Sequence, residues 1–366
     1  MRVLHLIDTL GRGGAENLLV ALLPALTQEG VEPVVGVLRP PYDLQSALED
    51  RGIRVVRLPR FHRWNLPAAT RALAQLCRQE QIALVHAHLY FPGIYAALLG
   101  LHAGPPMVET FHNLAYSGAN ARNWKLAARR KLRAGLLRRA GAKFYGVSQA
   151  VATDYARALG LPHVDVLSNV IDIAAIDAVE VAPRSSDALR IIVPGRLVRE
   201  KGHADLICAL QAAQLPPFEL CFVGGGALQN QLAAQAAEAG IDLRIAGTTN
   251  HAAFLAKVAR ADIVVTPSRH EGFGIAAAEA MALGKPLIAS RAGGLPEVVG
   301  DAGLLFDTGD ISALRAALER LATDEKLRAR LGREGSERVR RLFAPERAAR
   351  QLAQDYRAIL ARDSGG

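Results

Sequence analysis

The sequence predicts an α/β protein with two Rossmann-like, doubly wound domains that face each other across a cleft. Short apolar runs typical of buried parallel strands alternate with helical patterns in both halves of the chain. The alternation pauses between Asp177 and Asp187, a polar stretch that we interpret as a linker. A chain of 366 residues is long enough for two hydrophobic cores. We therefore expect an N-terminal domain over residues 1–178, a C-terminal domain over 189–344 and a last segment, 345–366.

The apolar runs place the strands in chain order. In the first domain, strands are expected at residues 3–7, 33–38, 55–58, 83–88, 107–112, 143–147 and 164–167, with helices between them such as 15–28 and 67–80. In the second domain, strands are expected at 190–193, 219–223, 243–246, 263–266, 286–289 and 304–306. A last helix is expected at 345–361, after these strands.

Composition limits the environment and the partners of the chain. Its formal net charge is +9 and its isoelectric point is near 9.8, which favours an acidic partner. Cys77, Cys208 and Cys221 are too scattered for a disulfide framework or a zinc site, which favours a reducing compartment. His5 and Asp8 interrupt the first apolar run, so it predicts a strand rather than a signal peptide. We expect a cytoplasmic protein.

Positive charge is concentrated between residues 122 and 143, where no acidic residue occurs. Interleaved leucines predict a basic amphipathic helix that could rest on anionic lipid at the inner face of the cytoplasmic membrane. A solvated helix packed on its leucine face is an equal alternative. Nucleic acid is not an expected partner, because no recognition motif accompanies the charge. The basic residues are Arg122, Lys125, Arg129, Arg130, Lys131, Arg133, Arg138, Arg139 and Lys143.

A glycine-rich turn after the strand at 263–266 is the first candidate for binding chemistry. Gly272 and Gly274 let the backbone approach a ligand closely, and a helix is expected to begin at Ile275. Glu271 then lies on the turn and Glu279 in the first or second turn of the helix. A strand end followed by a helix N-terminus is a place where an anionic ligand meets free amides, and the two carboxylates add acceptors for sugar hydroxyls. The alternative is an ordinary strand-to-helix turn that binds no ligand.

Two cations follow the strand at 190–193. Gly195 ends this strand, and Arg196 and Lys201 lie on the loop that leads to the next helix. Arginine binds phosphate oxygens through its planar fork and lysine as a compact charge, so the pair suits a diphosphate held above a strand end. The chain has no Asp-x-Asp sequence, the usual carboxylate pair for a metal-bridged nucleotide diphosphate. We therefore expect neither a metal nor another cofactor.

A second glycine-rich loop, with Gly11, Gly13 and Gly14, joins the first strand to the first helix. Its glycines would let the backbone close over a phosphate or an acceptor. Its spacing is neither the dinucleotide fingerprint nor a P-loop.

Histidines at the ends of first-domain strands form another group of candidates. His86 and His88 face the same side of one strand, and His112 ends the next. A metal triad is the minor alternative, because His-x-His alone does not specify a site. We expect His112 to line the cleft, where it can bind a sugar or an acceptor, and a structural role is at least as well supported for His86 and His88.

Together these segments resemble family 4 of the retaining glycosyltransferases, which have the GT-B fold. The resemblance covers most of the chain and is more specific in the second half. It is carried by Gly13-Gly-Ala-Glu16, Thr110-Phe-His112, Val147-Ser148, Gly195-Arg-Leu-Val-Arg-Glu-Lys-Gly202, the Glu271 and Glu279 pair, and Gly293-Gly-Leu-Pro-Glu297.

The resemblance implies roles for these residues. The C-terminal domain would bind a nucleotide-diphosphate sugar, with the diphosphate on Arg196 and Lys201. Glu271 and the amides of Phe273 and Gly274 would orient the sugar, and Glu279 would accept the ribose hydroxyls. The predicted donor set also contains Gly272, Ile275 and Gly247. The Gly13 and Gly14 loop would close on the phosphates, His112 would lie near the reacting sugar carbon, and the last helix would cross back to the N-terminal domain.

The resemblance has one departure, at Ser168-Asn-Val-Ile-Asp172. The family often has Pro-Asn-Gly-Val-Asp there, so the backbone of this loop must differ.

The function that follows is transfer of a sugar from a nucleotide diphosphate to a hydroxyl acceptor with retention of configuration. UDP-hexose or UDP-N-acetylhexosamine is the favoured donor and GDP-mannose the alternative. The expected acceptor is a lipid-linked or surface-polysaccharide glycan. Other hypotheses remain: a nucleotide-sugar epimerase, a sucrose-synthase-like or phosphorylase-like enzyme, or a non-catalytic nucleotide-sugar-binding subunit.

Overall fold

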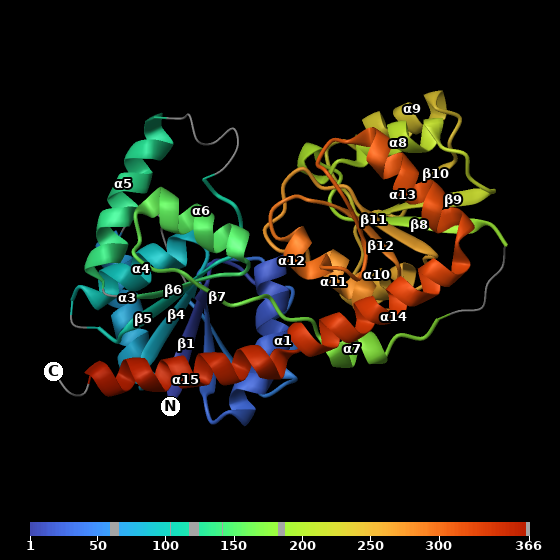
Figure 1. Cartoon of the computed structure of the whole chain (residues 1–366). Helices are drawn as coiled ribbons and strands as arrows, with labels where there is room; N and C mark the ends of the chain where they lie inside the picture. The colour runs from blue at the N-terminus through green and yellow to red at the C-terminus, as the bar shows by residue number, and fades with distance from the viewer. Residues whose placement is uncertain (59–65, 103, 117–123, 141, 182–186, 364–366) are drawn as a thin grey trace. The chain divides into compact units, whose positions relative to one another are not determined.

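The structure is a computed structural model that describes residues 1–58, 66–102, 104–116, 124–140, 142–181 and 187–363, without the side chains of 124–128 and 363. It divides into two compact units, Met1–Val170 with Pro345–Gly366, and Ile171–Ala344 (Figure 1). Each unit is one parallel sheet with flanking helices, which confirms the predicted fold class.

The first unit holds a seven-stranded sheet of order β3-β2-β1-β4-β5-β6-β7. Each predicted strand of this half is confirmed within about two residues. The elements are β1 (Arg2–Ile7), α1 (Gly14–Gln28), β2 (Glu32–Val37), α2 (Gln45–Glu49), β3 (Arg54–Arg57), α3 (Leu66–Gln79), β4 (Leu84–His88), α4 (Tyr90–Gly100), β5 (Met107–Phe111), α5 (Trp124–Arg139), β6 (Lys143–Gly146), α6 (Gln149–Leu159), β7 (Asp165–Val166) and α15 (Pro345–Asp363).

The second unit holds a six-stranded sheet of order β10-β9-β8-β11-β12-β13. Its predicted strands are confirmed with the same precision. The elements are α7 (Ile173–Asp177), β8 (Leu189–Pro194), the short 3-10 helix η2 (Arg199–Lys201), α8 (His203–Ala212), β9 (Phe218–Val223), α9 (Gln229–Glu238), β10 (Leu243–Ile245), α10 (His251–Val258), β11 (Ile263–Thr266), α11 (Ile275–Ala282), β12 (Leu287–Ser290), α12 (Leu295–Val299), β13 (Leu304–Phe306), α13 (Ile311–Thr323) and α14 (Glu325–Leu342).

The first unit ends at Val170 rather than at residue 178. The backbone N–H of Ile171 donates to the carbonyl of Phe343 at 2.9 Å, and α7 contacts α11. Asp177, at the end of α7, forms an ion pair with Arg340 of α14 at 2.5 Å. These contacts hold α7 to the second unit. Of the predicted linker at 177–187, residues 182–186 lie outside the described residues.

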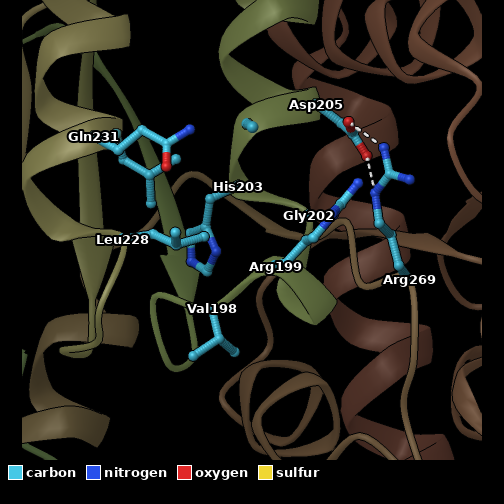
Figure 2. Close-up of a pocket in the computed structure, with 10 residues that line it drawn as sticks. Val198, Arg199, Gly202, His203, Asp205, Leu228, Gln231 and Arg269 are labelled. Atoms are coloured by element: carbon cyan, nitrogen blue, oxygen red, sulfur yellow. Dashed lines mark hydrogen bonds and ion pairs between the residues drawn. The ribbon is translucent and has the colours of Figure 1, made fainter. Parts of the chain in front are cut away.

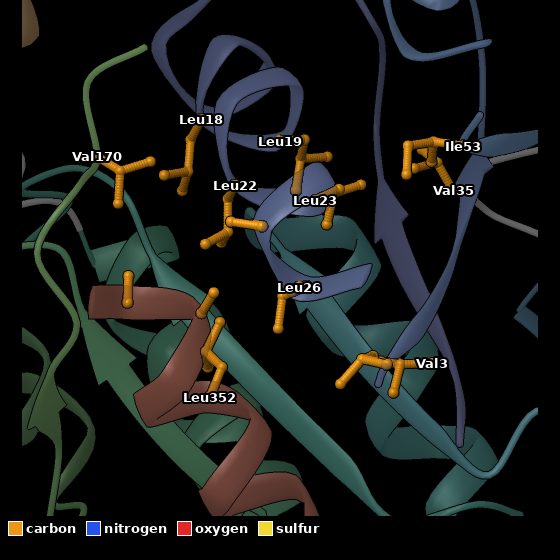
Figure 3. Close-up of a cluster of buried hydrophobic side chains, with 14 of the residues drawn as sticks. Val3, Leu18, Leu19, Leu22, Leu23, Leu26, Val35, Ile53, Val170 and Leu352 are labelled. Carbon is orange, nitrogen blue, oxygen red and sulfur yellow. The ribbon is translucent and has the colours of Figure 1, made fainter. Parts of the chain in front are cut away.

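The last helix, α15, completes the core of the first unit (Figure 3). Ala349, Leu352 and Tyr356 of α15 are fully buried. Leu352 belongs to the same hydrophobic cluster as Leu22 and Leu26 of α1. Each fully buried leucine of this kind stabilises the fold by about 1.5–3 kcal/mol. A segment that follows the second unit in sequence is therefore part of the packing of the first.

Helix α5 corrects the prediction for the basic stretch. Arg133 is almost completely buried and forms an ion pair with Glu109 of β5, whereas Leu132 is 77% exposed. Leu137 is fully buried, so only part of the leucine face packs against the unit. Arg133 thus belongs to the core. Arg122 and the side chain of Lys125 lie outside the described residues.

In the described residues, the helices are too short or too polar to span a membrane.

Candidate active site

The second unit offers a binding site at the point where its strand order changes direction. β8 and β11 are neighbours, but the chain continues from β8 to β9 on one side and from β11 to β12 on the other. The loops that leave the two strands therefore diverge at the carboxyl edge of the sheet. Ligands of doubly wound sheets bind in this position, outside the carboxyl ends of the strands. The predicted residues Arg196, Lys201 and Glu271 all lie on these two loops.

Lys201 and Glu271 join the two loops directly. The Lys201 ammonium forms a hydrogen-bonded ion pair with Oε2 of Glu271, which also accepts from Oγ of Ser268 at 3.3 Å. Both charged side chains are about one-fifth exposed, at 21% and 18%. Arg196 lies on the same loop and is exposed. An anionic ligand that binds the Lys201 ammonium competes with Glu271 for it.

Further contacts fix the two loops relative to each other. Arg269 binds the carboxylate of Asp205 on α8 through two hydrogen bonds of 3.0 and 2.7 Å (Figure 2). The backbone N–H groups of Arg269 and His270 both donate to the carbonyl of Glu200, at 2.7 and 3.2 Å. Such bidentate pairs fix geometry as well as adding energy. These contacts hold the two loops to each other.

A cavity of about 440 Å³ lies beside this frame, next to the start of α8 (Figure 2). Val198, Gly202 and Leu228 line it together with His203. The His203 ring is buried and packs edge-on against Phe222, and neither of its nitrogens has a hydrogen-bond partner among the described residues. Burial and, secondarily, Lys201 lower the pKa of His203 to about 4. This neutral ring fills space under the Lys201 loop.

The loop that carries Lys201 requires a glycine at position 202, both for its backbone conformation and for its packing. Its φ is +68°, and a Cβ there would lie 1.9 Å from the carbonyl oxygen of Pro267. We expect Gly202→Ala to destabilise the protein by at least about 2 kcal/mol in urea unfolding. Gly240→Ala is the matched control, because Gly240 has a φ of +70° and open space around it. Equal losses for the two variants would show that the close approach to Pro267 carries no cost.

Helix α11 places the second predicted carboxylate. Its first amides have no acceptor within the helix and point toward the strand ends. Phe273 is buried against Phe343, so only its backbone is available to a ligand, and Gly274 precedes the helix with a φ of +103°. Ile275 is the first helical residue and Gly247 follows β10. Glu279 lies in the second turn and binds Nε2 of His251, at 2.6 Å.

The first unit has a corresponding change of direction between β1 and β4. Gly13 precedes α1 and Gly14 begins it, so both predicted glycines lie where β1 leads into its helix. Oγ1 of Thr9 donates to Glu16 at 3.0 Å, and Asp8 forms an ion pair with Arg39. These contacts hold the loop.

Four histidines lie on neighbouring strands of this sheet, within β1, in β4 and just after β5, and His5 was not among the predicted candidates. Nδ1 of His5 is 3.1 Å from Nε2 of His88, and Nδ1 of His88 is 3.1 Å from Nε2 of His112. His86 uses both of its nitrogens, with the Tyr356 hydroxyl on Nδ1 and Thr110 on Nε2. Burial lowers the pKa of His5 and of His112 to about 3, and it also holds the pKa of His86 and of His88 well below the usual range.

A metal site was the minor alternative for these histidines. Ring nitrogens of His5, His86 and His88 lie within 4.8 Å of one another. His86, however, has both nitrogens hydrogen-bonded, and the group of possible ligands found in the described residues contains no carboxylate to balance a buried cation. The geometry favours a hydrogen-bonded network of neutral rings.

Family models match both halves of the chain. The model described as Glycosyltransferase Family 4 matches residues 12–175, and the model described as Glycosyl transferases group 1 matches residues 178–338. The chain belongs to glycosyltransferase family 4. The predicted family is confirmed, and the GT-B fold of its members agrees with the two doubly wound units.

Individual proteins are similar to part or to nearly all of this family 4 chain. Glycogen synthase of Mycobacterium tuberculosis is 35% identical over 205 residues, which are 54% of this chain and 49% of that protein. The lipopolysaccharide core biosynthesis glycosyltransferase LpsD of Rhizobium meliloti is 38% identical over 43% of this chain and 46% of its own length. The chain thus spans about half the length of these relatives. The crystal structure of Anabaena HepE with UDP and glucose has a TM-score of 0.81, with 21% identity, and covers 98% of this chain and 100% of that one.

Sequence reasoning missed His251, Ser268 and Asp205 in the site of this family 4 chain. His251 lies four residues after the predicted donor residue Gly247, but nothing in the sequence shows that its ring reaches Glu279 across 28 residues. Ser268 directly precedes the predicted turn. Its position at the end of an apolar run is the sequence signal that could have identified Ser268 as a site residue.

Proposed function

We propose that this family 4 chain transfers a sugar from a nucleoside-diphosphate donor to a hydroxyl acceptor, with retention of anomeric configuration and without a metal. UDP-hexose or UDP-N-acetylhexosamine is the favoured donor, and GDP-mannose is the alternative. The observation that carries the proposal is the carboxyl edge of β8 and β11, where Lys201 pairs with Glu271 and the exposed Arg196 lies on the same loop as Lys201. HepE, a protein of the same fold, binds UDP and glucose.

The donor would be held by parts of the site that match its chemistry. The diphosphate binds Arg196, Lys201 and the first amides of α11, where cations and the helix dipole stabilise negative charge. Glu271 and the amides of Phe273 and Gly274 orient the sugar. Glu279, with one oxygen on His251, accepts hydrogen bonds from the ribose hydroxyls through the other.

In the proposed reaction, the bond between the anomeric carbon and the phosphate oxygen breaks while the acceptor oxygen bonds to the same face of that carbon. The acceptor proton passes to the leaving phosphate oxygen. Negative charge grows on the diphosphate in the transition state, so cations placed there accelerate the step more than they tighten substrate binding.

The experiment that tests the donor assignment is a thermal-shift panel of UDP, GDP, ADP and their hexose and N-acetylhexosamine conjugates. A ligand at a hundredfold its dissociation constant stabilises the fold by about 2.7 kcal/mol. We expect one nucleotide family to raise the melting temperature of the wild type and of Glu334→Ala, a surface carboxylate on α14. Glu279→Ala should lose most of that shift. Without a shift in the wild type, the donor assignment fails.

Product analysis then separates the proposed reaction from its alternatives. A transferase consumes the donor sugar only when an acceptor is present, whereas an epimerase converts the nucleotide sugar alone. A non-catalytic subunit binds the donor without turnover.

A lipid-linked glycan at the inner face of the cytoplasmic membrane is the proposed acceptor. Helix α5 supports this part of the proposal, because Leu132 is 77% exposed and follows the exposed Arg129 and Lys131 by three positions and one. An apolar side chain among cations suits the interface of an anionic bilayer. LpsD, a relative, is a lipopolysaccharide core glycosyltransferase.

Vesicle sedimentation tests the membrane part separately. We expect Arg129→Glu with Lys131→Glu to weaken binding to phosphatidylserine-containing vesicles by well over tenfold, since each basic residue near the surface contributes about 1 kcal/mol. The control is Arg347→Glu with Arg350→Glu on α15, which changes the net charge equally. Arg133 is left unchanged, because it is buried. If both pairs lose binding equally, net charge rather than α5 governs attachment.

A further inference from the structure

The second unit has a groove on one face of its sheet that the helices leave partly open. The groove has a volume of about 460 Å³ and lies over β8, β9 and β10, at one side of the sheet (Figure 1). On the opposite face of these strands Leu220 and Phe222 are buried in the core, whereas Glu219 and Arg244 are exposed. Both faces of a parallel sheet are ordinarily covered. The open face, with a volume in the range of small-molecule sites, is therefore a candidate ligand site.

Four cations from different elements line this groove. Arg190 lies on β8, Arg244 on β10 and Lys257 on α10, and Arg260 follows that helix. The strand register places Arg244 next to Cys221 of β9, which also lines the groove. Burial raises the pKa of the Cys221 thiol, while Arg244 and Lys257 oppose this shift. Cations from β10 and α10 therefore converge on one point in the groove.

The groove carries more positive than negative charge. Two carboxylates, Glu219 and Asp242, line it together with the four cations, which gives a formal charge of +2. Glu219 forms an ion pair at 3.4 Å with Arg190, whose side chain is 8% exposed. The other three cations form no ion pair within the part of the chain that the structure describes. A cleft lined mainly by one sign of charge attracts counter-ions, because its walls focus the electric field.

The charge and the donors of the groove fit a phosphate monoester. A phosphate group of this kind carries about −1.5 to −2 charges at pH 7, which matches the charge of the groove, whereas a single carboxylate carries one. Guanidinium groups bind phosphate oxygens in pairs, and lysine adds a compact charge. Ile192 and Ala246 add apolar lining that can contact the uncharged part of such a molecule.

The groove is separate from the proposed donor site. Arg190 lies near the amino end of β8, about 13 Å from Pro194 at about 3.3 Å per residue, and Lys201 lies beyond that far end. Helix α10 begins at His251, which contacts the proposed donor site, and Lys257 lies about 9 Å further along the helix. Ligands of doubly wound sheets bind at the carboxyl ends of the strands, so this face is a second location.

We propose that this groove binds a small soluble phosphate monoester, held by Arg244, Lys257 and Arg260 over the open face of β9 and β10. This ligand is distinct from the nucleotide sugar. The inference therefore does not depend on the proposed function.

Alkylation of Cys221 measures occupancy of the groove directly. Iodoacetamide is small and neutral, and mass spectrometry of the labelled peptides distinguishes Cys221 from Cys208, which is also half-buried but contacts Gln235. The probe is phenyl phosphate, with benzoate and benzyl alcohol as matched molecules of lower charge, all at constant ionic strength. At about ten times its dissociation constant, phenyl phosphate should slow alkylation of Cys221 by about tenfold and leave Cys208 unchanged. Benzoate and benzyl alcohol should protect Cys221 much less.

A pair of double variants tests the role of the cations. Arg244→Gln with Lys257→Gln should abolish the protection at the same concentration of phenyl phosphate, because it removes two charge-assisted contacts. The control is Lys326→Gln with Arg333→Gln on α14, which changes the net charge equally at exposed positions and should keep the protection. Protection is taken as the ratio of the alkylation rates of Cys221 without and with the probe, so a different basal rate in a variant does not affect it.

The remaining outcomes decide against the inference. Equal protection of Cys221 and Cys208, or equal loss of protection in both double variants, would show a general effect of charge and overturn it. If phosphatidic acid vesicles or a glutamate-rich peptide protect Cys221 while phenyl phosphate does not, the groove binds a membrane or a protein segment instead. Lys201→Met should keep the protection, which separates this result from any failure of the donor site.

Discussion

Replacing Lys201 by methionine is expected to lower kcat/KM for sugar transfer by about 10²–10³-fold, the usual effect of removing one group that stabilises transition-state charge. Methionine keeps most of the length of the side chain, whose stem packs against Gly195. The substitution removes the cation and leaves Glu271 without its ion-pair partner beside the diphosphate. The diphosphate leaving group is then no longer attracted by the Lys201 ammonium and is repelled by the Glu271 carboxylate. Steady-state kinetics with the donor found in the thermal-shift panel measures the effect.

Two comparison variants make the Lys201 result specific. Lys326→Met removes an exposed lysine of α14 and should leave kcat/KM unchanged. Lys201→Arg keeps the charge but changes its shape, so it should recover part of the lost activity. If the loss falls entirely on KM while kcat is unchanged, Lys201 binds the ground state and transition state equally. A loss below threefold would remove Lys201 from the phosphate site.

The fold was predictable because its signal is local. A parallel strand covered on both faces is a short continuous apolar run, and glycine, proline or polar residues end it. The strands at 3–7 and 263–266 satisfy this rule and appear as β1 and β11. The same local reasoning did not predict that Arg133 of α5 is buried. Its ion-pair partner, Glu109, lies 24 residues earlier in the sequence, on β5. A sequence pattern read within one helix cannot include that partner.

The candidate site was predictable to the same extent. The carboxyl ends of parallel strands meet at one edge of a sheet, so loops after different strands were expected to converge, and Lys201 and Glu271 do lie together. The orientation of the helices determines which side chains pair at that edge. This orientation produces no recognisable pattern in the local sequence. His251 reaches Glu279 only because α10 begins at that residue. His5 lay inside an apolar run, and only the register of β1 with β4 places it opposite His86.

Replacing Arg133 by methionine is expected to destabilise the first unit by about 3–5 kcal/mol, because it leaves Glu109 buried without its partner. Arg133 also donates to the Tyr116 hydroxyl at 3.2 Å and lies over the ring of Tyr90. Burial raises the pKa of Glu109 to about 7 against the opposing effect of Arg133. Burial lowers and Glu109 raises the pKa of Arg133, with a net upward shift. Urea unfolding at several pH values measures the loss.

The pH dependence of the Arg133→Met loss identifies its cause. A carboxyl group with a raised folded-state pKa contributes stability below its unfolded pKa, and this stability is lost as pH rises through the folded pKa. In the wild type that loss is largely complete above about pH 7. Without Arg133 the pKa of Glu109 rises further, so the loss continues at higher pH, and the destabilisation should be larger at pH 8 than at pH 6.

The double variant Arg133→Met with Glu109→Leu separates charge from packing. It removes both buried charges, and replacing a buried ion pair by apolar side chains of similar size is often neutral or stabilising. We therefore expect it to recover most of the stability that Arg133→Met loses and to abolish the difference between pH 6 and pH 8. If instead the double variant is as unstable as Arg133→Met at both pH values, the stacking of Arg133 on its aromatic neighbours holds α5 in place. The unpaired carboxylate would then contribute little to the loss of stability.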